Sequence, residues 1–365
     1  MASDKQGPGL RPVNRRERVR ELRPVTALDY DIPHSRSAHA HAVAQRSFVD
    51  WKAVTTQMAR ERFHRGPQVT VEPFGDIVIV LDDGSLTLQS GELNYVAVWD
   101  YVRRTYGDQF DFLTFFTDFS VPFGYSFWSA IYFNTEGISP YRLPYDVRSQ
   151  WNTDRLQGFH FINPGHVNLM GVYLQEFGHQ WCSYVYFADS PDSQFVYTDL
   201  LLDDEPGHWD FFVDDGHSPM NYDFLFTPYM STHWEQLAGD PSIFDYHAIE
   251  GIEYCDLDLY LMGLVPPEGV QPPYFIANPL QVGSETWAGE RIDVTAQMVI
   301  NAMGPRRAPP GLLENNFRNG WILVTRNSRQ GRKTASRLDG IRQDFELRYH
   351  VATRCLGRVN TSLPQ

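Results

Sequence analysis

The stretch from Gly171 to Phe187, GVYLQEFGHQWCSYVYF, constrains this chain more than any other segment does. As a helix, it places Gln175, His179 and Cys182 on one face, because residues three and four positions apart are helical neighbours. Glu176 lies beside them, a quarter-turn round the helix. The segment therefore predicts a helix that gathers several polar side chains within an otherwise apolar run.

This spacing is that of the HExxH zinc helix, in which two histidines at i and i+4 bind the metal and the glutamate polarises its water. In this chain Gln175 occupies the position of the first histidine, while Glu176 and His179 are present. A neutral amide oxygen is a poor zinc ligand, although harder cations accept it. The sequence thus predicts an altered, QExxH-type metal site.

Length and composition indicate a folded protein: 365 residues, 42% hydrophobic, with 24 Phe, 19 Tyr and 9 Trp. No apolar run reaches the roughly 18–20 residues of a membrane span. The Arg-rich start, MASDKQGPGLRPVNRRERVRELRP, lacks the apolar core of a secretory signal. The three cysteines make no disulfide framework and suit a reducing compartment. We therefore expect a cytoplasmic protein with no membrane partner.

The net charge of −14 is unevenly distributed. Residues 1–24 include seven Lys or Arg and three acids, and residues 305–365 include twelve Lys or Arg and four acids. The middle of the chain therefore has 12 basic and 38 acidic residues. No Lys or Arg occurs between Arg155 and Arg291. Such a field repels nucleic acid and favours cations, either metal ions or basic substrates, although acidity that serves solubility alone is an equal alternative.

The chain divides near Val69. Residues 1–66 predict a partly flexible N-terminal extension with one helix over Phe48–His64, and residues 67–365 predict one catalytic-type domain. The run VTVEPFGDIVIVLDDGSLTL predicts two strands around a turn at Asp82–Gly84, where Asp-Gly is typical of hairpins. Further expected elements are a helix over Asn94–Tyr106 and strands over Phe110–Phe116 and within SFWSAIYFN. LQGFHFIN is expected to lead into the Gln175 helix through a helix start at Asn163-Pro164-Gly165.

The second half contains long acidic loops, then a short helix in YCDLDLYLMGLVPPEGV that ends at Met262-Gly263. A strand over Gly320–Arg326 precedes an amphipathic helix over Thr334–Thr353, whose apolar residues recur every three to four positions. Strands followed by helices around one central helix predict a single α+β domain.

Several motifs together resemble a bacterial family of zincin-like metalloproteases. They are LQGFHFINPG, LQEFGHQW, GHWDFFVDDGHSPM and DLYLMGLVPP, in that order. The family has an HE[FL]GHRW helix, an HW-FF segment followed by S-x-M, and a Y-S-P-L-D-x-Y-L-M-G-L segment. The similarity covers roughly Val69 to Leu363. It implies a zincin-like metalloprotease fold with a mixed sheet and a central active-site helix, and zinc peptidase chemistry.

The resemblance assigns roles to individual positions. Glu176 matches the general base and His179 the second metal ligand, and His208 of the HW segment is our choice for the third ligand. Met262 matches a Met-turn residue that forms an apolar floor under the metal. Tyr254 or Tyr260 could donate a hydrogen bond to an oxyanion, although packing tyrosines are the more common case.

Two positions depart from the family pattern. Gln175 stands at the first ligand position, and Cys255-Asp256 replaces Ser-Pro. A substitute ligand could be Cys182, for which a buried core thiol is the more common case, or His217, or a residue of Asp203–Glu205.

Two main functions compete. One is a zinc-dependent or other divalent-metal-dependent hydrolase of peptide bonds that acts on a peptide or small-molecule substrate. The other is a zincin-fold pseudoenzyme that binds a peptide or protein partner in the old cleft. A repurposed metalloenzyme in a biosynthetic pathway is a third alternative.

The acidic span predicts that basic peptides bind better than acidic ones, with a preference that fades as salt rises. The residues expected to cause it flank His208: Asp203, Asp204, Asp210, Asp214 and Asp215. A calcium site in the same loop is the competing explanation, since calcium needs several carboxylate and carbonyl oxygens.

Overall fold

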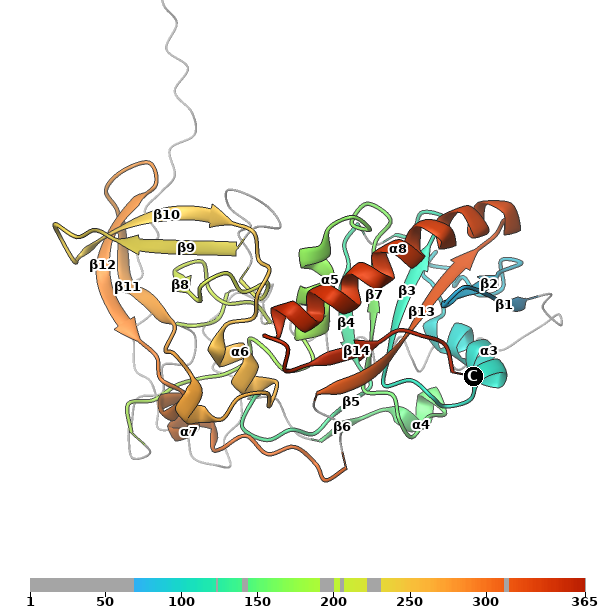
Figure 1. Ribbon diagram of the computed structural model, residues 1–365, viewed down its shortest axis with the longest axis horizontal. Coiled ribbons are helices and arrows are strands. Elements are labelled where there is room, and N and C mark those ends of the chain that lie inside the picture. The colour runs from blue at the N-terminus through green and yellow to red at the C-terminus, as the bar shows by residue number, and fades with distance from the viewer. Residues whose placement is uncertain are drawn as a thin grey trace, which may run out of the picture.

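The computed structural model of the protein describes residues 69–122, 124–139, 144–190, 200–203, 207–221, 231–311 and 315–364. The N-terminal extension of residues 1–66, with its expected helix, lies outside the described residues. The described residues form two large β-sheets and one two-stranded ribbon, with helices around and between the large sheets (Figure 1). The expected mixture of α and β structure is confirmed.

The larger sheet has seven strands. In spatial order they are β1 (Thr70–Phe74), β2 (Ile77–Leu81), β13 (Asn316–Thr325), β3 (Phe112–Thr117), β7 (Gly158–Phe161) and β4 (Phe127–Ala130), with β14 (Arg358–Asn360) beside the start of β13. The inner strands β2, β13, β3 and β7 run parallel, whereas β1 and β4 are antiparallel edge strands. This sheet is mixed, as the sequence predicted.

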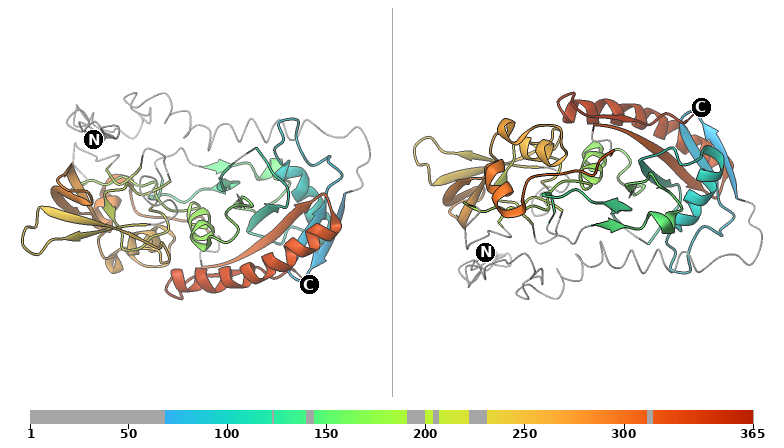
Figure 2. Two further views of the ribbon diagram at one scale, coloured as in Figure 1. Left: turned by 90° about the horizontal axis from the view of Figure 1, so that it is seen from above. Right: turned by 90° about the horizontal axis from the view of Figure 1, so that it is seen from below.

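Helices cover both faces of the seven-stranded sheet (Figure 2). The helices are α3 (Tyr95–Tyr106) and α4 (Arg148–Trp151) on one face, and α5 (Met170–Gly178) and α8 (Ser328–Ala352) on the other. Successive residues of a strand point to opposite faces, so Trp321 of β13 joins the core under α5 and α8, and Ile322 joins the core under α3. Helix α8 begins six residues before the predicted start at Thr334.

The smaller sheet has five antiparallel strands and lies at the opposite end of the molecule from β1 and β2 (Figure 1). Its strands, in spatial order, are β8 (Val213–Asp214), β11 (Tyr274–Gln281), β12 (Thr286–Asp293), β10 (Ile243–Ile249) and β9 (Ser231–Gln236). Its own core is small and mostly aromatic, with Trp234, Phe244 and Trp287 buried. The rest of the molecule is stabilised by larger apolar clusters.

Several short elements lie outside these two sheets. They are α6 (Asp256–Leu261), η3 (Pro267–Gly269), α7 (Ala296–Met303) and the ribbon of β5 (Tyr132–Phe133) with β6 (Tyr145–Asp146). Helix α6 lies between the five-stranded sheet and α5 (Figures 1 and 2). Residues of α5, α6 and α8 share one apolar core, so the last turn of α5 is held at the centre of the molecule.

Two sequence predictions, of a hairpin turn and of a helix start, were wrong. The hairpin turn between β1 and β2 is at Gly75-Asp76, where Gly75 adopts a φ of +58°, and not at Asp82–Gly84. Asp82 instead follows β2 and accepts hydrogen bonds from the backbone of Gly84 and Leu86. A buried Asp that caps its own loop produces the same Asp-Gly pattern as a hairpin turn.

The second wrong prediction concerns the start of α5. Asn163 accepts a hydrogen bond from Gly165 N in a local turn, and the helix begins only at Met170, after Leu169. Asn, Pro and Gly favour turns as strongly as they favour helix starts, so the pattern alone did not separate the two.

Among the described helices, none is both long and apolar enough to cross a membrane.

Candidate active site at the end of helix α5

The last turn of α5 brings Gln175, Glu176 and His179 together inside the protein. His179 N donates to Gln175 O at 3.1 Å, which places the two residues one helical turn apart, as the sequence predicted. The side chains of all three residues are buried, with 6–9% of their surface exposed. Every residue of α5 from Val172 onward is buried, which is typical of a helix surrounded by protein on all sides.

The carboxyl group of Glu176 is buried without a hydrogen-bond or ion-pair partner within the described residues. Burial alone raises the pKa of Glu176 from 4.5 to about 8, because the charged form has lost its water. Buried carboxyl groups are normally hydrogen-bonded, so a carboxyl group left without partners at this position indicates a functional role.

His179 ends the helix and faces a second imidazole. The rings of His179 and His208 lie 5.0 Å apart between centroids, nearly perpendicular to each other. Burial lowers the pKa of His179 well below 6.5, and the neighbouring imidazoles of His208 and His160 lower it further. His179 is therefore neutral at physiological pH, which is the protonation state that a metal ligand or a general base requires.

The backbone holds His208 in place beside α5. Gly207 N donates to Ser183 O at 3.2 Å, and Gly207 has a φ of +113°, in the left-handed region that favours glycine. A Cβ atom at Gly207 would lie 3.2 Å from the ring of His179. Trp209 follows and anchors the segment, since its indole nitrogen donates to Asp258 Oδ1 at 3.0 Å. The predicted HW motif thus lies directly against the predicted metal helix.

His160 is a member of this site that the sequence interpretation did not include. It lies on β7, is 2% exposed, and its Nε2 has no hydrogen-bond partner among the described residues. Burial lowers the pKa of His160 to about 3, so the ring is neutral. Its ring is 5.3 Å from that of Phe177 on α5. The sequence feature that could have identified His160 is a histidine between two phenylalanines, in GFHF, which is an unusual place for a polar residue in a buried strand.

Close packing under the helix explains Gly178 and defines the surroundings of Tyr254 and Met262. A Cβ atom at Gly178 would lie 2.4 Å from Met220 Sδ and 3.0 Å from the ring of Tyr254. Tyr254 is fully buried, and its hydroxyl donates to Leu174 O at 2.5 Å, so it supports α5 instead of facing a substrate. Met220 thus packs on this end of α5, while Met262 is a core residue that ends α6.

Cys182 is not on the predicted helical face. Helix α5 stops at Gly178, and the following turn, in which Ser183 has a φ of +67°, places Cys182 in the core. Its Sγ donates to Asp258 O, and burial raises the pKa of Cys182 well above 9. This is the core thiol that the sequence favoured. The prediction of a helix through Phe187 was wrong because glycine followed by a buried polar turn ends the helix.

Cys255, where the family has Ser, caps helix α6. Its Sγ accepts from Asp258 N at 3.4 Å, and its own N–H donates to Asp258 Oδ2 at 3.0 Å, which completes a capping box. The sulfur therefore takes the place of the hydroxyl oxygen in the cap.

The acidic residues near His208 are mostly internal. Asp210, Asp214 and Asp215 are buried and accept backbone hydrogen bonds from Phe212, Gly216 and Ser218, respectively. Asp204 and Glu205 lie outside the described residues, and Asp203 is half-buried. The three buried carboxyl groups organise their own loop. The preference for basic peptides stays a prediction.

The donor set for a metal at this site is incomplete within the described residues, where no group of three or more His, Cys, Asp or Glu could hold an ion. His179 and His208 supply two imidazoles, of which that of His179 is held neutral by burial, and Gln175 supplies an amide with no other partner among the described residues. The other proposed substitute, His217, is exposed and stacks on His233 at 6.2 Å. The arrangement therefore fits an open, weak two-imidazole site better than a closed structural zinc site.

Comparisons of this chain with protein-family models, with curated proteins and with solved structures return no match.

Proposed function

We propose that this protein is a zincin-like metal-dependent hydrolase of peptide bonds with a weakened QExxH metal site. The observation that supports this proposal is the buried, partnerless carboxyl group of Glu176, one turn of helix before a pair of facing imidazoles. A carboxyl group in that position contributes nothing to packing that an apolar side chain would not, and it costs free energy when charged. Proton transfer explains its presence.

His179 and His208 would hold the metal ion, with the amide oxygen of Gln175 as the weakest donor. A bound zinc ion supplies a water of lowered pKa and polarises a carbonyl group. The low pKa of His179 keeps its nitrogen available for binding at neutral pH. Since an amide replaces one imidazole, we expect incomplete occupancy, or a harder divalent cation in place of zinc.

Glu176 would act as the proton carrier. Its pKa of about 8 would fall toward neutral pH beside a bound cation, because opposite charge favours the ionised form. At that pKa the carboxylate can take a proton from water and return it to the leaving amine. The neutral imidazole of His160, behind α5, keeps the surroundings free of a permanent charge that would fix Glu176 in one state.

The mixed sheet and the central position of α5 are the arrangement that the motif resemblance implied, so they support the proposed zincin-like architecture. Met220 and Tyr254 both pack against Gly178, so residues of three distant motif segments meet around one helix. Such convergence is expected if the motifs were retained for one site.

The proposal is tested by restoring the missing ligand. Gln175→His should raise the zinc content of protein purified without chelators and should raise its melting temperature in zinc, because a ligand that binds only the folded state stabilises it. Gln330→His, on the exposed start of α8, adds a histidine elsewhere and serves as the matched control. Equal zinc content in the two variants would exclude a metal site on α5.

Activity is tested separately. Glu176→Gln should abolish most peptide hydrolysis and leave metal content unchanged, whereas His179→Ala and His208→Ala should lose both. Hydrolysis that persists in Glu176→Gln would place the chemistry in another part of the protein.

The second candidate function is a zincin-fold pseudoenzyme that binds a peptide or protein partner. The observation that favours it is the amide at the first ligand position, together with the lack of a three-ligand group within the described residues. On this alternative, the wild type and Glu176→Gln bind the same peptides with equal affinity and neither releases product. Calorimetry combined with mass spectrometry of the recovered peptide separates the two candidates.

A further inference from the structure

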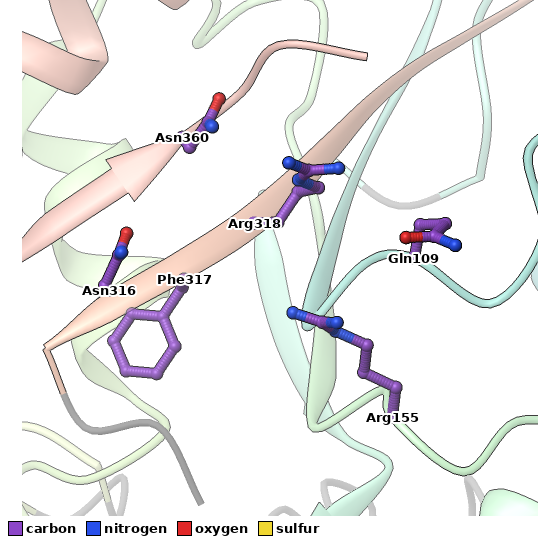
Figure 3. A pocket seen from close by; sticks show the side chains of 6 residues that line it. All are labelled: Gln109, Arg155, Asn316, Phe317, Arg318 and Asn360. Carbon is purple, nitrogen blue, oxygen red and sulfur yellow. The ribbon is translucent and has the colours of Figure 1, made fainter. Parts of the chain in front are cut away.

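A pocket of about 200 Å³ opens on the side of the seven-stranded sheet where β14 joins β13. It is lined by Gln109, Arg155, Asn316, Phe317, Arg318 and Asn360. Figure 3 shows both guanidinium groups at this opening, with Asn316 and Asn360 on the side away from Gln109. Every polar group of the lining is therefore a guanidinium or a primary amide, in a chain whose net charge is −14.

Arg318 is the uncompensated charge of this pocket. Its backbone N–H donates to Asp111 Oδ2 at 2.7 Å, which fixes the main chain. Within the described residues, its guanidinium makes no ion pair and no hydrogen bond, although the residue is half-buried. In contrast, most arginines of α8 are paired with acids one turn away or on β1. A half-buried guanidinium without an anion is a site prepared for one.

Arg155 is held in place by Asp111. Asp111 is 6% exposed at its side chain and accepts from Arg155 Nε at 2.9 Å and from Nη2 at 3.1 Å. This two-bond contact holds the guanidinium plane and leaves Nη1 unused. Because Asp111 also binds the backbone of Arg318, one buried carboxylate sets the positions of both arginines. Its single negative charge compensates only one of them.

The amides add further donors. The Asn360 side-chain oxygen accepts from Ser362 N at 2.9 Å, so its NH₂ group is the end left for a ligand. Asn316 and Gln109 make no side-chain hydrogen bond within the described residues. Guanidinium and amide N–H groups bind the oxygens of carboxylates and phosphates, and the planar guanidinium binds two oxygens at once.

We propose that this pocket is a binding site for a small oxyanion, either a carboxylate or a phosphate group, held by the Arg318 guanidinium with support from Arg155 and the Asn360 amide. The pocket volume admits a small organic acid or a free phosphate. The proposal does not depend on the α5 site. Phe317 forms the wall between the pocket and the core, since its ring lies 5.3 Å from that of Trp181, just beyond α5.

Titration calorimetry of the full chain with inorganic phosphate and with succinate, each at constant ionic strength set by chloride, tests the site. Saturable binding of either anion is expected, and the tighter of the two identifies the ligand group. Arg318→Gln should weaken binding about tenfold or more, because it removes a charge-assisted hydrogen bond. Arg329→Gln removes one exposed positive charge on α8 that has no ion pair within the described residues, and it should leave binding unchanged.

Equal loss in Arg318→Gln and Arg329→Gln would show a general charge effect and overturn the proposal, as would the absence of saturable binding of both anions in the wild type. Circular dichroism verifies that each variant is folded. If Arg318→Gln does not fold, Arg318→Lys replaces it. That variant keeps the charge but loses the two-pronged contact, so weaker binding supports the site and unchanged affinity overturns it.

Discussion

Glu176 in the last turn of α5 and Asp258 in the first turn of α6 are both buried, and their carboxyl groups have opposite surroundings. Asp258 on α6 is 0% exposed and accepts hydrogen bonds from Ser218 Oγ, Cys255 N and Trp209 Nε1. Glu176 on α5 is 6% exposed and, within the described residues, accepts none. Both groups belong to one apolar core region, so burial alone does not distinguish them.

The difference shows that Asp258 has a structural role that Glu176 lacks. Asp258 connects three segments: the HW loop through Trp209, the turn at Ser218, and the cap of α6 through Cys255. Burial raises the pKa of Asp258, and its hydrogen bonds act against that rise. Glu176 connects nothing, and its pKa rises to about 8 unopposed. A carboxyl group without a structural role remains free to exchange protons.

The largest expected effect is on Asp258. Asp258→Ala leaves the Ser218 hydroxyl, the Trp209 indole and the Cys255 amide without their acceptor inside the protein, so it should lower the free energy of unfolding by roughly 4 kcal/mol. Urea denaturation monitored by tryptophan fluorescence measures this. Asp258→Asn keeps an acceptor oxygen and should cost less. If Glu176→Ala destabilised the protein as much as Asp258→Ala, the contrast between the two groups would disappear.

The next effect is the pH dependence caused by Glu176. The unfolded chain releases this proton near pH 4.5 and the folded protein near pH 8, so the free energy of unfolding falls as pH rises through that window. Glu176→Gln removes this loss. Between pH 4.5 and pH 8, the free energy of unfolding of Glu176→Gln should therefore rise relative to that of the wild type by a few kcal/mol, at most about 5.

Urea denaturation in the presence of a chelator, on both sides of the window, measures the Glu176 effect. Glu290→Gln, an exposed glutamate on β12, is the control and should show no such trend. A constant difference between Glu176→Gln and the wild type at all pH values would mean that Glu176 is solvated or paired in solution.

A smaller effect is expected at Cys182. Cys182→Ala removes one fully buried sulfur atom and its contact with Asp258 O, so the free energy of unfolding should fall by about 1.5 kcal/mol. Metal content should stay at the wild-type level, because the thiol lies in the core and not on the ligand face of α5. Loss of metal in this variant, measured by elemental analysis, would restore Cys182 as a ligand.

The smallest effect is expected at Tyr254. Tyr254→Phe deletes the hydroxyl that donates to Leu174 O and should cost about 1 kcal/mol of stability. Because this hydroxyl faces the helix backbone, turnover under the proposed hydrolase function should change little. A decrease in kcat much larger than the loss of stability explains would return Tyr254 to the role of an oxyanion donor.

The sequence predicted local structure correctly where a side-chain pattern is typical of only one kind of local structure. The 3.6-residue period placed helices α3 and α8, and the i, i+4 spacing placed Gln175 and His179 one turn apart. Patterns shared by two local structures were poorer guides. Asp82-Asp83-Gly84 looked like a hairpin turn but forms a loop cap, and Asn163-Pro164-Gly165 looked like a helix start but forms a turn.

The sequence by itself predicted a helix that carries the QExxH residues, and it predicted that His208 lies beside that helix. Only the tertiary structure decided that His160 from β7 stands behind α5, that Tyr254 and Cys182 belong to the core, and that Asp214 organises its own loop. The reason is physical: sequence spacing fixes which side chains share a helical face. Whether a polar group meets a hydrogen-bond donor, an imidazole or nothing depends on segments that are distant in the chain and meet only when the core closes around them.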